Sequence, residues 1–156
     1  MILRGGSHLV IDAAQKNAEK NAALTLLISG LRLLTGKLLT VSRNTPMRVT
    51  TATATIGIRG TGFYVESEPE QTYFCTCYGT TDITASADPD SKISVTSKHH
   101  DKPLYIVKDG GRGNNIRNAP FINHTDQELA LIEALVGRTT PFVFANDAYS
   151  APRRDY

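Results

Sequence analysis

The chain lacks a strong charge of either sign. Its 156 residues carry 17 Lys and Arg against 15 Asp and Glu, which gives a formal net charge of +2. No basic run with interleaved aromatic residues occurs, and the densest positive pair is Arg153–Arg154 near the C-terminus. Proteins that bind nucleic acids present a basic patch or stripe to the phosphates. We therefore expect no nucleic-acid partner.

Long apolar runs are also missing. The most apolar window, residues 22–34, is interrupted by polar residues, Gly30 and Arg32, and falls short of the roughly 20 apolar residues that span a bilayer. Residues 1–12 contain neither the continuous apolar segment nor the small-residue cleavage site of an export signal. The sequence thus predicts no transmembrane segment. Because residues 2–11 already look like a strand, we expect the natural sequence to begin upstream of Met1. The alternative is that the protein is cytoplasmic.

Composition and pattern indicate one soluble globular domain that is mostly β-structure. Hydrophobic residues make up 40% and charged residues 21%, and a chain of this length buries roughly 68–70% of its unfolded surface. Short strand signals recur from His8 to Val107, and we expect residues 24–41 to form three strands separated at Ser29–Gly30 and Thr35–Gly36. Such spacing is typical of all-β folds. With no exact repeat, a solenoid-like fold and a sandwich of short strands both stay open.

The most patterned stretch runs from residue 47 to residue 67. Small and apolar residues alternate with threonines up to Ile58, so that even-numbered positions share one face. After Gly60-Thr61-Gly62 the apolar phase moves to odd numbers, at Phe63 and Val65. A change of phase at a Gly-x-Gly predicts a β-bulge or a sharp bend.

A helix with both ends marked is predicted after Asn123. Thr125 is the candidate N-cap and Glu128, three residues later, completes a capping box. Gly137 supplies the C-terminal stop. The expected buried stripe consists of Leu129, Ile132, Leu135 and Val136. We therefore divide the chain into a β domain (1–120), whose first strands lie upstream of Met1 if the chain is a fragment, a docking helix (121–137), and a C-terminal clamp and tail (138–156).

The only two cysteines lie two residues apart in the strand-like segment TYFCTCYG, residues 72–79. On an extended strand, residues i and i+2 have Cα atoms about 6.6–7 Å apart, at or beyond the usual limit for a disulfide. Their side chains nevertheless project from the same face. We expect Cys75 and Cys77 to be an unbridged pair with both sulfurs on one side.

Three interpretations of this pair stay open. Cys75 and Cys77 could hold zinc or copper together with imidazoles from His99, His100 or His124, although CxC is a weaker signal than the CxxC pairs of most zinc sites. Alternatively, the thiols are small buried side chains, and the histidines, including the His-His-Asp loop at 99–101, lie at the surface.

The third interpretation is a Cys–His enzyme, with Cys75 or Cys77 as nucleophile and His99 or His124 as base. A thiol in the middle of a strand is normally inert, and no CxxCH haem motif occurs. We therefore expect no enzyme activity.

The run TATATIGIRGTGFYVE resembles the signature of FecR-like domains. The residues that carry the resemblance are Gly57, Arg59, Gly60, Thr61 and Phe63. The similarity extends from about residue 27 to Val107, some two thirds of the chain, and a subgroup of FecR-domain proteins is also similar in its CTCYG, His-His and NHTD segments. The resemblance implies an all-β domain that works in the bacterial cell envelope, usually the periplasm. Some members relay a signal from an outer-membrane transporter to a sigma factor, through a cytoplasmic segment and a transmembrane helix that are not found here.

From these observations we expect a non-enzymatic binding or assembly module of the cell envelope, with a metal-binding envelope protein as the alternative. If first strands are missing, an open sheet edge favours self-association or strand addition by a protein partner. For Arg59 the favoured role is an internal tether that donates to carbonyls at the bend, and the alternative is an anion site among the glycine amides.

Overall fold

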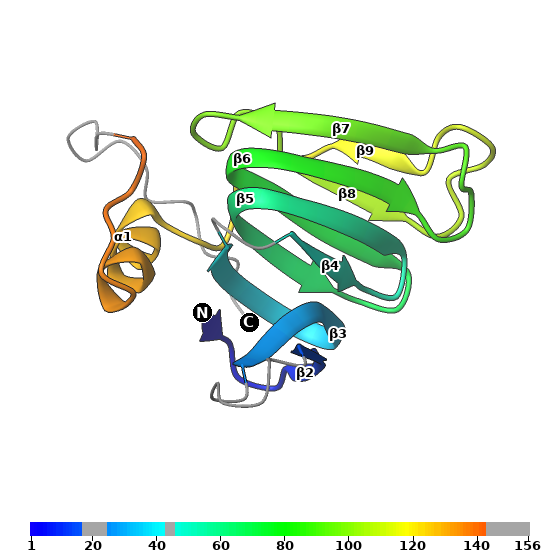
Figure 1. The fold of residues 1–156 in the computed structure, drawn as a ribbon. Helices are drawn as coiled ribbons and strands as arrows, with labels where there is room; N and C mark the ends of the chain where they lie inside the picture. Colours follow the sequence, from blue (N-terminus) through cyan, green and yellow to red (C-terminus); the bar gives the residue numbers. More distant parts are fainter. Residues whose placement is uncertain (17–24, 43–45, 143–156) are drawn as a thin grey trace.

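The structure, a computed structural model, describes residues 1–16, 25–42 and 46–142 (Figure 1). This part of the chain contains nine strands in one sheet and a single helix. The elements are β1 (Ile2–Leu3), β2 (His8–Lys16), β3 (Thr25–Ser42), β4 (Met47–Thr50), β5 (Ala54–Ser67), β6 (Gln71–Ala85), β7 (Lys92–Ser97), β8 (Leu104–Val107), β9 (Ile116–Asn118) and α1 (Asp126–Leu135). The main path through the sheet is β1-β3-β4-β5-β6-β8-β9, and β2 and β7 pair with β3 and β6. Only the β3–β4 pairing is parallel, so the sheet is mixed, and the predicted all-β fold with one C-terminal helix is confirmed.

The long strands β5 and β6 form the centre of the sheet and hold its two halves together. They are joined by a tight connection in which the Glu68 amide donates to the Gln71 carbonyl at 2.9 Å. The first residues of β6 pair with β8 and its last residues pair with β7. One buried cluster collects side chains from both ends of β5 and β6: Leu31, Leu33, Leu38, Val49, Ala54, Ile56, Ile58, Phe63, Val65, Phe74, Ile83, Ala85, Val95, Leu104 and Ile106. The sheet therefore curves, so that residues from both ends of β5 and β6 reach this first cluster (Figure 1).

A second buried cluster lies on the opposite face of β5 and β6. It contains Leu39, Tyr64, Tyr73, Cys75, Cys77, Tyr78, Ile122, Leu129 and Ile132. Successive side chains of a strand point to opposite faces, so Phe63 and Val65 enter the first cluster and Tyr64, between them, enters the second. Helix α1 and the segment before it cover this second cluster, which places the cysteines under the helix.

Helix α1 begins as its local sequence predicts. The Thr125 hydroxyl accepts from the Glu128 amide at 3.2 Å, and the Glu128 carboxylate accepts from the Thr125 amide at 3.0 Å, which completes the capping box. Gly137 follows the helix with φ +70°.

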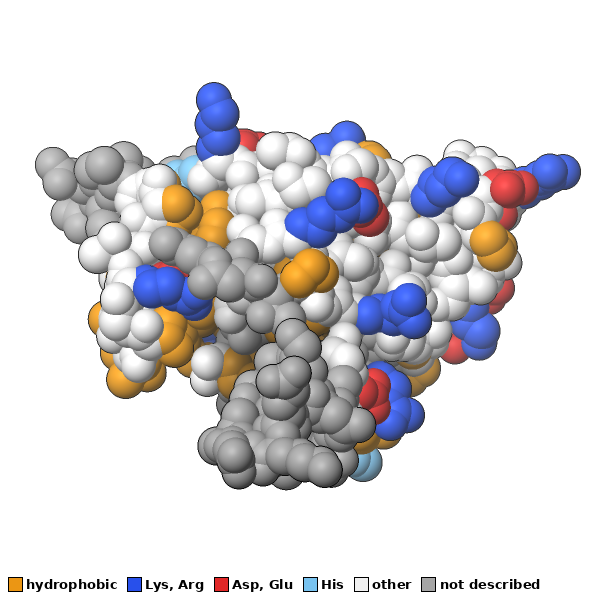
Figure 2. Space-filling model, viewed as in Figure 1, with side chains coloured by type: hydrophobic (Ala, Val, Ile, Leu, Met, Phe, Trp, Pro, Cys, Tyr) orange, Lys and Arg blue, Asp and Glu red, His pale blue; other side chains and the backbone are white. Residues whose placement is uncertain are grey.

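The predicted buried stripe of this helix is only half right. Leu129 and Ile132 are buried, whereas Leu135 is 74% exposed and Val136 55% exposed. Figure 2 shows apolar side chains at the surface over this helix. The buried position one turn after Leu129 is taken by Glu133, which accepts a hydrogen bond from the Tyr78 hydroxyl. The apolar end of the helix therefore extends past the second cluster.

Residues 25–42 form one long strand, not the three that Ser29–Gly30 and Thr35–Gly36 predicted. Gly36 has φ +93°, and a Cβ there would lie 2.2 Å from the Ser7 Oγ. The strand changes partner at this point, from β2 to β1, and does not end. β2 likewise continues to Lys16, and residues 17–24 lie outside the described residues.

The bulge expected in β5 is confirmed, but the role expected for Arg59 is wrong. The register of β5 on β6 shifts between Arg59 and Gly62. A Cβ at Gly62 would lie 2.5 Å from the Tyr78 ring, so only glycine lets this ring pack on the strand. The Arg59 side chain is 70% exposed and pairs with Asp82 on β6, because the residue lies on the outer face, away from buried carbonyls.

Two features of the described residues bear on the predictions about membrane spans and surface charge. None of their helices is both long and apolar enough to cross a bilayer. On the face drawn in Figure 2, positive and negative side chains are interspersed and form no field of one sign.

Of the C-terminal clamp, residues 138–142 are described and Phe142 packs on the second cluster; the tail lies outside the described residues.

Candidate metal centre

Cys75 and Cys77 project from the same face of β6. They are free thiols, and both are fully buried in the second cluster. Thr76, between them, points to the other face, where its hydroxyl meets that of Thr81 at 2.7 Å. The expectation of an unbridged pair with both sulfurs on one side is thus confirmed.

The loop after β7 brings His100 to the first sulfur. The Asp101 carboxylate accepts from the Lys98 amide at 2.6 Å, and this bond is the main reason that the pKa of Asp101 lies below its usual range. The Asp101 amide donates to Ser97 Oγ at 3.0 Å, which closes the loop. His100, at φ +53°, donates its amide to the Cys77 carbonyl at 2.9 Å. The loop is therefore held against β6 with the His100 ring turned inward.

The segment before α1 brings His124 to the second sulfur. The His124 ring stacks on Tyr64 with centroids 4.4 Å apart. Asn123 precedes it at φ +62° and donates its side-chain amide to the buried Glu66 carboxylate at 2.6 Å. This anchor and the helix N-cap at Thr125 fix the backbone on both sides of His124.

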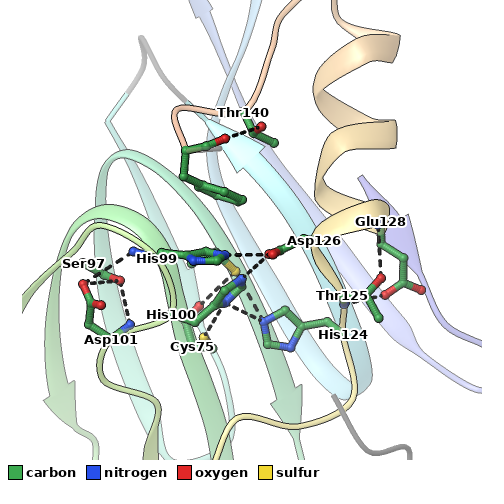
Figure 3. Close-up of polar contacts among 12 residues, drawn as sticks. Cys75, Ser97, His99, His100, Asp101, His124, Thr125, Asp126, Glu128 and Thr140 are labelled. Carbon is green, nitrogen blue, oxygen red and sulfur yellow. Dashed lines mark hydrogen bonds and ion pairs between the residues drawn. The ribbon is translucent and has the colours of Figure 1, made fainter. Parts of the chain in front are cut away.

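Four potential ligand atoms converge at this point, which is drawn in Figure 3. Cys75 Sγ lies 3.3 Å from His100 Nδ1, Cys77 Sγ lies 3.5 Å from His124 Nε2, and the two nitrogens are 3.3 Å apart. All four atoms lie within 4.8 Å of one another. With zinc–sulfur bonds of about 2.3 Å and zinc–nitrogen bonds of about 2.0–2.1 Å, a tetrahedron has N–N edges of about 3.3 Å and S–N edges of about 3.6 Å. The observed spacings match these edges within about 0.3 Å.

The outward nitrogen of each imidazole has an acceptor. His124 Nδ1 donates to the Ile122 carbonyl at 2.7 Å, and His100 Nε2 donates to Asp126 Oδ1 at 2.9 Å. A proton held on the outward nitrogen leaves the inward nitrogen with its lone pair, which is the form that binds a metal ion. These acceptors therefore orient the rings for coordination.

The charges in the centre favour a cation. Burial raises the pKa of the Cys75 thiol, but hydrogen bonding with Cys77, His100 and His124 outweighs it and holds that pKa well below its ordinary value. Burial raises the pKa of Cys77 well above its ordinary value, and the neighbouring Cys75 adds to the shift. For His100, burial lowers the pKa, but Cys75 and Asp126 raise it above its ordinary value. A divalent ion held here would let both sulfurs ionise, because it would neutralise the two thiolates together.

The predicted site residues divide into two groups. Cys75, Cys77, His100 and His124 come together in the centre, whereas His99 lies outside it, with its Nε2 2.8 Å from Asp126 Oδ2. The interpretation with surface histidines is wrong, because His100 and His124 are both buried. The exposed loop predicted at 99–101 is likewise wrong for His100.

Asp126 was missed as a site residue. A carboxylate in the first turn of a helix is common because it suits the positive end of the helix dipole, yet Asp126 is buried and accepts from both His99 and His100. The signal available was its position two residues after His124. The FecR-like residues Gly57, Arg59, Gly60, Thr61 and Phe63 lie at and around the bulge of β5, apart from the four ligands.

Comparison with known proteins leaves the family unassigned. No family model and no curated protein matches the chain. Two crystal structures of proteins from Parabacteroides distasonis ATCC 8503, described as candidate anti-sigma factors, are similar to it at 14% and 15% identity, with TM-scores of 0.45 and 0.47. The matches cover 72% and 84% of this chain but only 59% and 58% of those chains, less than two thirds of their length. The FecR-like resemblance stays a prediction.

Proposed function

We propose that this chain is a non-enzymatic metal-binding domain in which Cys75, Cys77, His100 and His124 hold one zinc ion. The observation that carries the proposal is the spacing of the four ligand atoms: three of their separations match the edges of a tetrahedral zinc site, and all four atoms lie within 4.8 Å of one another. Tetrahedral S₂N₂ sites favour zinc over the octahedral oxygen-ligated metals, and copper is the competing ion. A two-iron cluster with two histidines would place sulfurs and nitrogens on different irons, whereas here each sulfur lies next to a nitrogen.

The ion's role in this proposal is structural. All four ligands are buried, so no coordination position faces solvent, which is typical of structural zinc and not of catalytic zinc. The ligands come from β6, from the loop after β7, and from the segment that leads into α1. One ion therefore joins three separate segments and holds the helix over the second cluster.

The geometry gives a Cys–His enzyme one supporting observation. Cys75, His100 and Asp126 form a line of nucleophile, base and orienting carboxylate, with contacts of 3.3 and 2.9 Å. Against it stands the burial of the sulfur, because a nucleophile must reach its substrate. Rapid labelling of Cys75 in the native protein near neutral pH would support the enzyme, and resistance to labelling supports the structural site.

The cell envelope is the compartment that we propose, with the periplasm as the usual location of FecR-like domains; the support is the resemblance at residues 51–66. A protein partner or self-association is proposed as well. Among the described residues, β2, β7 and β9 each pair with a single strand and present an edge that another strand could join. A strictly monomeric mass at high protein concentration would count against self-association.

Elemental analysis tests the proposed function. Protein purified without chelator, or reconstituted with zinc, should contain one zinc per chain, and the Cys75→Ser/Cys77→Ser variant should contain none. His124→Gln should also lose the ion under dialysis, whereas the matched control His8→Gln, on β2 opposite Thr35, should retain it. Full metal content in the double cysteine variant, or no zinc in the wild type, would refute the proposal.

A further inference from the structure

A buried metal centre needs a route for its ion. His99 is a part-exposed neighbour of the centre with a ligating atom, and its side chain is 20% exposed. His99 Nε2 lies 2.8 Å from one oxygen of Asp126, and the other oxygen of Asp126 lies 2.9 Å from His100 Nε2. A continuous chain of ligating groups therefore leads from the surface to a ligand of the centre, as Figure 3 shows.

We propose that His99, His100 and Asp126 form a second, outer zinc site, which takes the ion from solvent and passes it to the buried centre. This proposal rests on the function proposed above. The ligating atoms of the three residues lie within 4.8 Å of one another. Two imidazoles and a carboxylate are a donor set that zinc accepts, and three protein ligands leave a fourth position for water. An open fourth position lets the ion both arrive and leave, in contrast to the closed inner centre.

His100 belongs to both sites, and this makes them alternatives. A neutral imidazole has one lone pair. With the lone pair on Nε2, the ring serves the outer site and its Nδ1–H points to Cys75 Sγ, 3.3 Å away. With the lone pair on Nδ1, it serves the inner centre and its Nε2–H donates to Asp126. Transfer therefore moves a proton from Nδ1 to Nε2, the ring charge is unchanged, and thiol protons displaced by the ion leave to solvent. One ion per chain is expected, not two.

The outer residues are already held in place. The His99 ring stacks on Phe142 with centroids 4.2 Å apart, which keeps its Nε2 directed at Asp126. The Asp101 carboxylate accepts from the Lys98 amide at 2.6 Å and fixes the loop that carries both histidines. The site is thus formed by the fold before any ion arrives, so binding an ion there requires little ordering.

Loading kinetics of the metal-free full chain test the proposal, with cobalt(II) as the probe because its thiolate complex absorbs in the near ultraviolet. His99→Gln should reach the same final spectrum and one cobalt per chain, but more slowly, on the order of tenfold if the outer site matters to loading as much as outer-shell groups matter to other metal sites. Release of cobalt to a chelator should slow by the same factor, so that Kd is unchanged. A residue that only helps the ion enter and leave changes the loading rate and the release rate equally. His8→Gln is the matched control and should load at the wild-type rate.

The outcomes separate this inference from the proposed function. Loading of His99→Gln at the wild-type rate overturns the outer site while the inner centre stands. A lower stoichiometry or a changed thiolate band in that variant also overturns it, since His99 would then be an inner ligand. A wild type that binds no cobalt refutes the proposed function itself. Asp126→Asn, which retains an acceptor for His100 but removes the charge, provides a second variant and should also load more slowly.

Discussion

Removal of the ion should release the helix and leave the sheet folded. The first cluster contains none of the four ligands, whereas the second cluster contains Cys75 and Cys77 and the helix residues Leu129 and Ile132. A ligand that binds only the folded state stabilises it by about 4 kcal/mol when its free concentration is a thousand times its Kd. For a chain of this size each kcal/mol shifts Tm by roughly 2–4 °C, so the chelated protein should melt roughly 8–16 °C lower than the zinc-loaded protein.

The assay is thermal unfolding followed by circular dichroism, with zinc and with a chelator. The Cys75→Ser/Cys77→Ser variant is the control and should melt at one temperature under both conditions. Hydrogen exchange adds a local readout: chelation should raise amide exchange in residues 122–135, while residues 54–58 of β5, which line the first cluster, stay protected. An identical Tm with and without zinc in the wild type would contradict stabilisation of the fold by the ion.

Three further predictions concern the helix and the loops. Ile132→Ala should destabilise the protein by about 2–5 kcal/mol in urea unfolding, because the side chain is buried under the helix, whereas Leu135→Ala, at an exposed position, should change stability by less than about 0.5 kcal/mol. Thr125→Ala removes the N-cap and should cost about 1 kcal/mol in the same assay; no change would contradict the capping role. The hydrogen bond from the Gly113 amide lowers the pKa of Asp88 in the folded protein. The charged Asp88 carboxylate therefore stabilises the fold above the unfolded pKa of about 3.9, and this contribution is lost as the pH falls through the folded pKa. Urea unfolding of Asp88→Asn should therefore differ from wild type at neutral pH and converge with it in acid.

Local signals in the sequence predicted the helix and the bulge. The cap at Thr125 and the stop at Gly137 act within a few residues, so they can be read without the fold. The continuous β3 could not be read in this way, because Gly36 marks a change of partner strand, which depends on where Ser7 lies. Arg59 was misassigned for the same reason: whether it faces buried carbonyls or Asp82 depends on the register of β5 on β6.

The candidate site shows the same division. Alternation along a strand predicted that Cys75 and Cys77 share a face, which needs no tertiary information. The choice among the histidines does need it, because His100 and His99 are adjacent and only the loop conformation, with His100 at φ +53°, turns one inward. Asp126 could not be identified from its own segment, since its partners lie 26 and 27 residues away in the chain.

X-ray absorption at the zinc edge tests the metal centre most directly, because it reports the atoms bound to the ion in the purified protein. We expect one zinc per chain with two sulfur ligands at about 2.3 Å and two nitrogen ligands at about 2.0–2.1 Å. A spectrum with only oxygen and nitrogen neighbours, or a protein that retains no zinc, would contradict it.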